Sequence, residues 1–393
     1  MTTTSDEVLG AVRARYAAGA GSRVPELCCP VDYAAPLLEV LPAEILERDY
    51  GCGDPSRYVR PGDRVLDLGS GAGKICYLAS QLTGAGGSVV GVDATPEMLA
   101  LAREHRASVA AKIGWDNVAF KRGHIQDLAL DLDLLERWLA AHPVRGVEDL
   151  EALRAEEARL RREAPLVPDG SIDLVLSNCV LNLVAAGDKR RMFAEIHRVL
   201  ARGGRCAISD IVSDEDVPAA LQRDPELWTG CISGAMREDR FLDAFAEAGL
   251  YGVEIAAYQT EPWAVVEGIE FRSMTVTAWK GKEGPCRDHG EAVIYRGPWK
   301  SVEDDDGHVL RRGVRTAVCR KTFELYSRPP YAACCEPKPP RTAVSDTEAV
   351  DFDCAAGTLR APQTSKRAAV PASSAAPGAN SDAGSCCAPG DCC

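Results

Sequence analysis

A glycine-rich turn directly after a short apolar strand limits what this chain can fold into more than any other feature of its sequence. Residues 65–68 (VLDL) form an apolar run, residues 69–73 (GSGAG) follow it, and a helical pattern begins at Lys74. Glycine allows the backbone to turn tightly and to approach a bound molecule closely. A turn of this kind between a buried strand and a helix is typical of α/β domains that bind a cofactor beyond the carboxyl end of the strand.

Strand-like and helical segments alternate on both sides of this turn. Apolar runs predict further strands at residues 88–93, 118–120, 172–177 and 205–209. Helices are expected at residues 74–82 and from Pro96 onward, with Thr95 as the N-cap of the second helix. This alternation predicts an α/β fold with a doubly wound, mostly parallel sheet, because parallel strands are joined by crossover helices.

The chain has 393 residues and divides into segments of different character. An insertion at residues 128–168 is rich in Leu, Ala, Glu and Arg and contains an amphipathic helix over residues 148–163, to which we assign no chemistry. In chain order we expect a helical segment with cysteines at 1–60, a cofactor-binding domain at 61–215, a region completing the sheet at 216–262, a small α+β domain at 263–332 and a disordered, cysteine-containing tail at 333–393.

Charge and composition argue against two classes of partner. The net charge is −13 without a dominant block of Lys or Arg, whereas nucleic-acid binding needs a positive surface. No apolar run has the length of a membrane span, and the start of the chain, MTTTSDE, lacks the basic and apolar regions of a signal peptide. We therefore expect a cytoplasmic protein that binds neither nucleic acid nor membrane, and a monomer by default.

The residues of the turn point to S-adenosylmethionine as the cofactor. Its spacing is G-x-G-x-G with Asp67 two residues before the first glycine, whereas dinucleotide-binding turns use G-x-G-x-x-G to hold a pyrophosphate. S-adenosylmethionine has no phosphate, and its amino group and sulfonium are cationic, so a carboxylate at the strand end favours it. Asp93 ends the next strand, where a carboxylate can accept hydrogen bonds from both ribose hydroxyls.

A third part of the expected cofactor site follows the third strand. There the apolar Ile125 and the polar Gln126 are placed to bracket the adenine ring. The expected cofactor-binding residues are Asp67, Gly69, Ser70, Gly71, Gly73, Asp93, Ala94, Ile125, Gln126 and Asn178.

Sixteen cysteines are unusual in a cytoplasmic chain, where thiols more often bind metals or do redox chemistry than form structural bridges. Ligands of open α/β sheets bind beyond the carboxyl ends of the strands. Cys179 follows the fourth predicted strand, Cys231 lies in a loop after the fifth, and Cys52 is flanked by glycines. Cys28 and Cys29 form a pair in an N-terminal loop. The topology therefore predicts that several thiols gather at one edge of the sheet.

These cysteines occur in motifs that resemble the arsenite methyltransferase family. The motifs are YGCG around Cys52, SNCVLNL around Cys179 and GCISG around Cys231, and the resemblance covers residues 20–325 as well as the paired cysteines of the tail. It implies a Rossmann-like class I methyltransferase fold, a metalloid-binding region in the part that completes the sheet, and a small C-terminal domain. The long insertion departs from the animal enzymes and indicates a bacterial branch.

The resemblance implies that Cys52, Cys179 and Cys231 are catalytic and bind trivalent arsenic, with Cys28 or Cys29 as an additional thiol. Arsenic is thiophilic and thiolates are soft ligands. Three thiolates leave one arsenic lone pair to take the methyl group, so the enzyme contributes mainly positioning, without a general base or a permanent metal. A disulfide among these cysteines then returns arsenic to the trivalent state, and thioredoxin or glutathione reduces the disulfide. Arsenite and methylarsenite are the implied substrates.

The other cysteines receive different expectations. Cys76 and Cys206 are expected in the core, and Cys286 and Cys319 are expected to be structural. Two interpretations stay open for the cysteines in or near the tail. They could capture or deliver metalloid, or they could simply be solvated thiols. These are Cys334, Cys335, Cys354, Cys386, Cys387, Cys392 and Cys393.

Two other functions compete with arsenic methylation. A methyltransferase acting on a quinone or another small organic acceptor shares the cofactor turn, but gives no reason for Cys52, Cys179 and Cys231 to occur together. A thiol-based metalloid scavenger on a degenerate methyltransferase fold is the second alternative. Against it, Asp67, the glycines of the turn and Asp93 are all present.

Overall fold

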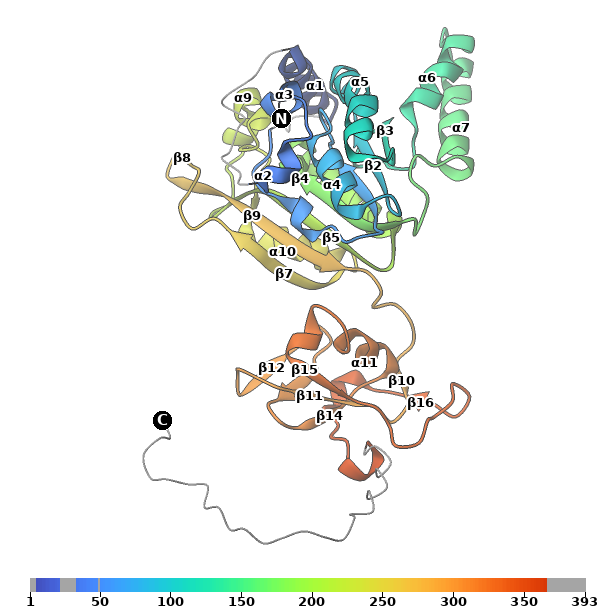
Figure 1. The fold of residues 1–393 in the computed structure, drawn as a ribbon, viewed down its shortest axis with the longest axis vertical. Coiled ribbons are helices and arrows are strands. Elements are labelled where there is room, and N and C mark those ends of the chain that lie inside the picture. The colour runs from blue at the N-terminus through green and yellow to red at the C-terminus, as the bar shows by residue number, and fades with distance from the viewer. Residues whose placement is uncertain (1–4, 22–32, 49, 366–393) are drawn as a thin grey trace. The chain divides into compact units, whose positions relative to one another are not determined.

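The computed structural model describes residues 5–21, 33–48 and 50–365, and the chain divides into two units with a boundary between Lys282 and Glu283 (Figure 1). The first unit is an α/β domain, and the second is small and mostly β. Within the described ranges, no helix is both long and apolar enough to cross a membrane.

One large sheet forms the framework of the first unit. Its strands are β1 (Arg64–Leu68), β2 (Ser88–Asp93), β3 (Val118–Arg122), β4 (Ile172–Asn178), β5 (Leu200–Ser213), β6 (Met236–Arg237), β7 (Tyr251–Tyr258), β8 (Ala264–Val266) and β9 (Ile269–Trp279). The order is β3-β2-β1-β4-β5-β9-β7, with β6 beside β5 and β8 beside β9. The first five strands pair in parallel, and β9 runs antiparallel to β5 and β7. The predicted doubly wound, mostly parallel sheet is confirmed.

Helices cover both faces of this sheet. They are α1 (Ser5–Gly21), α2 (Ala35–Leu38), α3 (Ala43–Glu47), α4 (Lys74–Thr83), α5 (Pro96–Ile113), α6 (Leu132–Ala141), α7 (Val147–Glu163), α8 (Ala186–Val199), α9 (Pro225–Thr229) and α10 (Glu238–Glu247). Apolar residues of α4 and α5 form one core cluster, and those of α8 and α10 form another. Val65 joins the first cluster while Leu66 and Leu68 join the second, because successive side chains of a strand point to opposite faces.

The expected insertion folds as the two helices α6 and α7, which lie side by side at the β3 end of the sheet (Figure 1). Leu130, Leu135 and Leu160 form a small buried cluster between them. Through this cluster the two helices bury apolar side chains against each other. The insertion therefore packs without contributing a strand to the sheet.

The structure corrects the expected start of the small domain at residue 263. Strand β9 lies in the main sheet and pairs with β5 from Phe271 to Trp279, and β8 pairs with β9. Most residues of β9 are buried, because the strand lies between β5 and β7. A strand that returns antiparallel has no crossover helix before it, so the strand–helix alternation does not predict where it belongs.

The second unit contains β10 (Arg287–Asp288), β11 (Ala292–Tyr295), β12 (Ser301–Glu303), β13 (Val309–Arg311), β14 (Arg315–Ala317), α11 (Arg320–Tyr326), β15 (Cys335–Lys338) and β16 (Val350–Asp351). Its strands form a β14-β11-β15 sheet and the pairs β10-β16 and β12-β13. The expectation of a disordered tail from residue 333 is therefore wrong for β15 and β16. β15 pairs with β11 and β16 pairs with β10, both far away in the sequence. The Ala/Pro-rich composition of this segment gives no sign of such pairing. The paired cysteines after residue 365 lie outside the described residues.

Candidate functional site

The glycine-rich turn joins β1 to α4 and is held by Asp93 at the end of β2. The Asp93 carboxylate accepts hydrogen bonds from the backbone N–H of Gly71 at 2.9 Å and of Thr95 at 2.8 Å. Gly69 has a φ of 69°, and a Cβ there would come within 2.4 Å of the Val180 side chain. Glycine is therefore required at this position, both for its backbone conformation and for the close approach of the loop after β4.

A pocket opens between this turn and the carboxyl ends of the strands. All the expected cofactor residues line it except Gly73, which precedes α4 as its N-cap with a φ of 88°. The lining therefore includes Asp67, Gly69, Ser70, Gly71, Asp93, Ala94, Ile125, Gln126 and Asn178. Cys179 lies in the wall of the same pocket, so a thiol position and the cofactor positions share one space.

The polar groups of this pocket fit S-adenosylmethionine. The Asp67 side chain is 2% exposed, and Cys76 donates a hydrogen bond to its Oδ2 at 3.3 Å. Burial raises the pKa of Asp93, while the backbone N–H groups that it binds lower it. The buried Oγ of Ser70 has no hydrogen-bond partner among the described residues. The Asp67 carboxylate suits the cationic groups of the cofactor, the Asp93 carboxylate suits the ribose hydroxyls, and an unsatisfied buried hydroxyl suits a polar ligand atom.

Helix α1 contributes residues to the pocket that the sequence did not indicate. Val12, Arg13 and Tyr16 line it, and burial raises the pKa of the Tyr16 hydroxyl. Arg15 donates a hydrogen bond to Thr229 Oγ1 at 2.8 Å, which ties α1 to the end of α9. No motif marks α1, so its place over the carboxyl ends of the strands is a result of tertiary packing.

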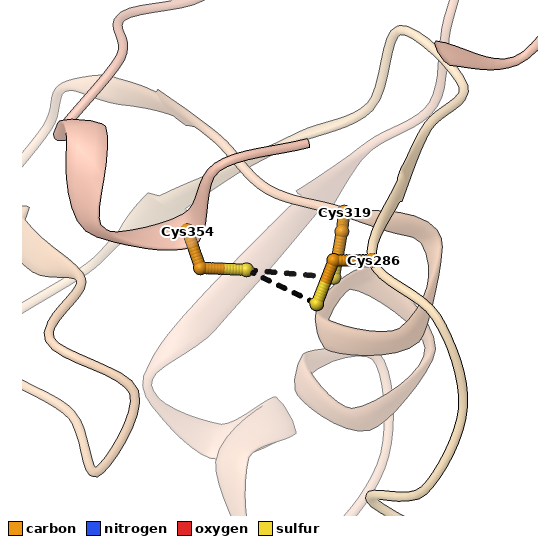
Figure 2. A group of neighbouring side chains, drawn as sticks. All are labelled: Cys286, Cys319 and Cys354. Atoms are coloured by element: carbon orange, nitrogen blue, oxygen red, sulfur yellow. Dashed lines mark hydrogen bonds between the residues drawn. The ribbon is translucent and has the colours of Figure 1, made fainter. Parts of the chain in front are cut away.

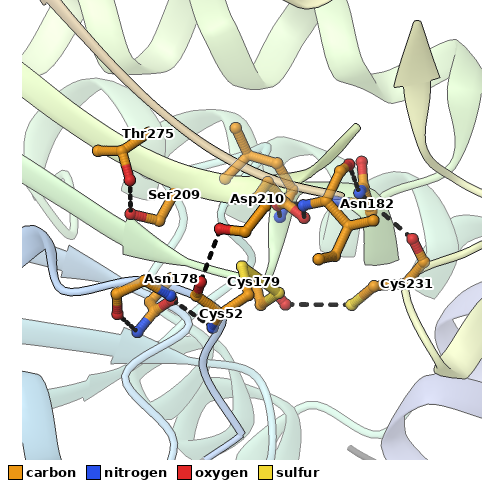
Figure 3. Close-up of a disulfide and its surroundings, with 12 residues drawn as sticks. Cys52, Asn178, Cys179, Asn182, Ser209, Asp210, Cys231 and Thr275 are labelled. Carbon is orange, nitrogen blue, oxygen red and sulfur yellow. Dashed lines mark hydrogen bonds between the residues drawn. A yellow bond between two sulfur atoms is a disulfide. The ribbon is translucent and has the colours of Figure 1, made fainter. Parts of the chain in front are cut away.

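Cys52 and Cys179 form a disulfide, and Cys231 lies beside it (Figure 3). The Cys231 Sγ donates a weak hydrogen bond to the Cys179 carbonyl oxygen at 3.4 Å. The ligand atoms of Cys179, Cys231 and Asp210 all lie within 4.8 Å of one another. The three cysteines are each about 5% exposed and belong to one apolar cluster. The structure thus brings together all three cysteines that the sequence placed at this edge of the sheet.

Asn178, the last residue of β4, holds the Cys52 loop in place (Figure 3). Its Oδ1 accepts hydrogen bonds from the backbone N–H of Cys52 at 2.9 Å and of Gly53 at 3.1 Å. Its Nδ2 donates to the Gly53 carbonyl at 2.8 Å and to the Tyr33 hydroxyl at 3.2 Å. These bonds use the full capacity of the amide, so the Asn178 side chain positions the Cys52 loop, while the residue also lines the pocket as expected. A Cβ at residue 51 would lie 2.2 Å from this Nδ2, which explains Gly51.

A second asparagine, Asn182 in the turn η3 (Leu181–Leu183), holds the Cys231 loop. Its Nδ2 donates to the Ile211 carbonyl of β5 at 2.5 Å and more weakly to the Cys231 carbonyl at 3.4 Å. Lys189 of α8 donates to Asn182 Oδ1 at 3.3 Å and to the Gly234 carbonyl at 2.5 Å. A Cβ at Gly234 would lie 1.9 Å from the Asn182 backbone oxygen. The asparagines before and after Cys179 therefore each fix the loop of one partner cysteine.

The buried carboxylate of Asp210, on β5, holds the backbone that follows Cys179. Its Oδ2 accepts hydrogen bonds from the backbone N–H of Leu181 at 2.8 Å and of Asn182 at 3.3 Å. Burial raises the pKa of Asp210 to about 6, and burial lowers the pKa of Lys189 to about 8, each opposed by the charge of the other. Between these pH values Asp210 is negative and Lys189 is positive. Both groups are buried, and their hydrogen bonds hold the loops that carry Cys179 and Cys231.

The backbone at two of the cysteines is strained. Cys179 has a φ of 60° and Cys231 a φ of 64°. A non-glycine residue in this left-handed region costs about 1–3 kcal/mol and persists only where the surroundings fix it. The backbone N–H of Cys179 donates to the Ser209 carbonyl at 2.8 Å, which is one such restraint. Strained positions of this kind concentrate at functional sites, and the sequence has no signal for them.

The remaining thiol predictions divide into three groups. Cys76 and Cys206 are both fully buried, so the expectation that they lie in the core is confirmed. Cys28 and Cys29 lie outside the described residues. In the second unit, the sulfur atoms of a further group of cysteines lie close together, and this group is considered below.

Comparison with known proteins adds independent findings. A family profile described as a methyltransferase domain matches residues 60–139 and 148–249, and one described as a domain of unknown function matches residues 282–370. An arsenite methyltransferase of Aquipseudomonas alcaligenes is 32% identical over 76% of this chain and 80% of its own length. The arsenite methyltransferase of Mus musculus is 32% identical over 76% of this chain and 73% of its own length.

A solved structure resembles the chain over most of its length. It is the crystal structure of an arsenic (III) S-adenosylmethionine methyltransferase from Chlamydomonas reinhardtii, with 27% sequence identity and a TM-score of 0.52. The match covers 83% of this chain and 99% of that one.

Proposed function

The chain belongs to the arsenite methyltransferase family and is an S-adenosylmethionine-dependent enzyme, and we propose that it methylates trivalent arsenic held by the thiolates of Cys52, Cys179 and Cys231. Arsenite and methylarsenite are the substrates that we assign, with Cys28 or Cys29 as an additional thiol. Thioredoxin or glutathione is the proposed reductant, and the reaction serves arsenic detoxification. We place it in the cytoplasm, where thiols are kept reduced.

One observation carries the proposal. Cys179 lies in the wall of the cofactor pocket, and the asparagines on its two sides hold the loops of Cys52 and Cys231 against it. The arrangement places soft sulfur ligands next to the space in which a methyl donor fits, and soft ligands favour a thiophilic acceptor over carbon, nitrogen or oxygen.

The pocket residues supply binding and orientation in the methyl transfer. When bound, the cofactor supplies an electrophilic methyl group on a sulfonium, and Asp67 and Asp93 are placed to hold its cationic and ribose groups. Three thiolates leave arsenic one lone pair. With the cofactor held in this pocket, the lone pair would take its methyl group and S-adenosylhomocysteine would leave as the neutral thioether, so arsenic would be formally oxidised from the trivalent to the pentavalent state. No proton has to be removed from the acceptor, and positioning is the main contribution of the protein.

The cysteines also account for the return of arsenic to the trivalent state. Two thiolates each give up one electron as a sulfur–sulfur bond forms, and the two electrons reduce the methylated arsenic. The disulfide between Cys52 and Cys179 supports this proposal, because the step forms a disulfide among the cysteines of the site. An external thiol then attacks it, and two exchange steps restore both thiols while the reductant becomes the disulfide.

Arsenic speciation in a reconstituted reaction tests the proposal. The protein is incubated with arsenite, S-adenosylmethionine and a thiol reductant, and methylated arsenic is separated and quantified. Cys179→Ser is expected to lower kcat/KM by at least about 100-fold, because one arsenic ligand and the electron source for re-reduction are lost together. Cys334→Ser, which changes a thiol in the second unit, is the matched control and should keep the wild-type rate.

Two further measurements separate the competing functions. Calorimetry with S-adenosylmethionine establishes that Cys179→Ser still folds and binds the cofactor. Methylation at the wild-type rate by this variant contradicts the proposal. Arsenic binding without turnover in the wild-type protein selects the scavenger, and the absence of both binding and turnover points to an organic acceptor such as a quinone.

A further inference from the structure

Three cysteines from separate segments of the second unit point their sulfur atoms at one another (Figure 2). Cys286 directly precedes β10, Cys319 directly precedes α11, and Cys354 begins the turn η6 (Cys354–Ala356). The Cys354 Sγ lies 3.5 Å from that of Cys286 and 3.9 Å from that of Cys319, and all three sulfur atoms lie within 4.8 Å of one another. We call these residues the second thiol cluster.

The surrounding backbone holds the second thiol cluster in place. The backbone N–H of Phe352 donates to the Cys286 carbonyl at 3.0 Å, which ties the segment before Cys354 to the one that carries Cys286. The Cys319 Sγ accepts a hydrogen bond from the backbone N–H of Thr322 at 3.5 Å. Cys319 is buried, while the other two cysteines are partly exposed. The cluster is therefore closed on the side of Cys319 and reachable from solvent on the side of Cys286 and Cys354.

The sequence did not predict this grouping: Cys286 and Cys319 were expected to be structural, and for Cys354, in or near the tail, both metalloid capture or delivery and a simple solvated thiol were left open. The antiparallel pairing of β10 with β16 places Arg287 opposite Asp351. This pairing brings Cys286, just before β10, close to Cys354, shortly after β16. None of the three is in a disulfide in this structure. Thiols in such a group are typical of sites for soft, thiophilic ions.

The number of ligands distinguishes the ions that such a group can hold. Structural zinc sites are closed and tetrahedral, with four ligands. The described part of the chain offers three sulfur ligands here and adds no fourth His, Cys, Asp or Glu to the group. Trivalent arsenic forms three bonds and keeps a lone pair, so three thiolates complete its coordination. The ligand set therefore favours trivalent arsenic over zinc.

We propose that the second thiol cluster is a second binding site for trivalent arsenic, additional to the site at Cys179. The choice of arsenic over other soft ions rests on the proposed function. When arsenite, As(OH)₃, binds, three arsenic–oxygen bonds break and three arsenic–sulfur bonds form. Each thiol proton leaves with one hydroxide as water, so three waters are released and no electron is transferred. The site needs neither a reductant nor a methyl donor.

Arsenic stoichiometry of the full chain tests this proposal. The background variant carries Cys52→Ser, Cys179→Ser and Cys231→Ser, so the three proposed arsenic ligands of the catalytic site are absent. The reduced protein is incubated with arsenite and desalted, and arsenic per chain is measured by mass spectrometry. Adding Cys354→Ser is expected to lower the content by one arsenic per chain, whereas adding the partly exposed Cys334→Ser should not change it. X-ray absorption should show three sulfur neighbours for the arsenic that is lost.

Several outcomes would overturn the second site. They are an unchanged arsenic content after Cys354→Ser, an equal loss after Cys334→Ser, and a zinc ion in the purified protein that Cys354→Ser removes. Circular dichroism checks that each variant is folded, and Cys286→Ser provides a second variant with the same expected loss. Methylation by Cys354→Ser in the otherwise wild-type chain should keep its kcat. Because the binding test uses a variant without Cys52, Cys179 and Cys231, its result and a failure of the proposed function can be told apart.

Discussion

Replacing Asn178 by alanine should make the Cys52–Cys179 disulfide easier to reduce. The Asn178 amide makes three hydrogen bonds to the Cys52 loop, to the N–H groups of Cys52 and Gly53 and to the Gly53 carbonyl, at 2.8–3.1 Å. At a net contribution of about 1 kcal/mol each, their loss weakens docking of the loop by about 3 kcal/mol. Since 1.4 kcal/mol is a factor of ten, the effective concentration of the Cys52 thiol at Cys179 falls by up to about 100-fold.

For a two-electron couple, a 100-fold change corresponds to a reduction potential about 60 mV less negative. The assay equilibrates the full chain in dithiol redox buffers, quenches with acid, alkylates the free thiols and quantifies the Cys52 and Cys179 peptides by mass spectrometry. Asn117→Ala is the matched control, because Asn117 makes a similar set of hydrogen bonds, to Ser80, Gly84 and Gly87, in a different part of the domain. It should lower stability but leave the potential unchanged.

The reasoning is refuted if the potential of Asn178→Ala stays within about 10 mV of the wild-type value, which is roughly a twofold effect. It is also refuted if the Asn117→Ala control shifts the potential as far, since the effect would then follow global stability. Thermal unfolding of both variants provides the comparison. A shift confined to Asn178→Ala would establish that this side chain acts through Cys52.

Three further predictions follow from the site. Gly234→Ala should lower the free energy of unfolding, measured in urea titrations, by about 1–3 kcal/mol, because its Cβ would lie 1.9 Å from a backbone oxygen of Asn182. Gly187→Ala is the control and should not lower the free energy of unfolding, because the space around Gly187 is open. Asp93→Ala should raise the calorimetric Kd for S-adenosylmethionine at least tenfold while the arsenite affinity is unchanged. Asp210, whose pKa burial raises to about 6, holds a proton in the folded state that the unfolded state has lost. As the pH rises from 4 to 7, the wild-type protein should therefore lose stability relative to Asp210→Asn, and equal slopes would contradict the shift.

The cofactor pocket was predictable because each of its main residues lies at or just after the end of a strand. The turn follows β1, Asp93 ends β2 and Ile125 lies shortly after β3, and parallel strands end at the same edge of the sheet. The contribution of Tyr16 was not predictable, since α1 carries no motif and reaches the pocket only through its packing against other helices. Asn178 was expected to contact the cofactor and does line the pocket, but the hydrogen bonds of its side chain to the loop of Cys52 were not predictable, because that loop is far away in the sequence.

The sequence by itself determined the alternation of the first five strands with helices and the cofactor, and its motifs, through their resemblance to a known family, singled out the three cysteines. These depend on local patterns, namely strand periodicity, glycine spacing and the position of a residue directly after a strand. Only the tertiary structure decided that asparagines fix the loops of Cys52 and Cys231, that β9 belongs to the main sheet, and that Cys354 joins Cys286. Such contacts join segments that are far apart in the chain, and the antiparallel pairings and side-chain hydrogen bonds that create them leave no periodic trace in the sequence.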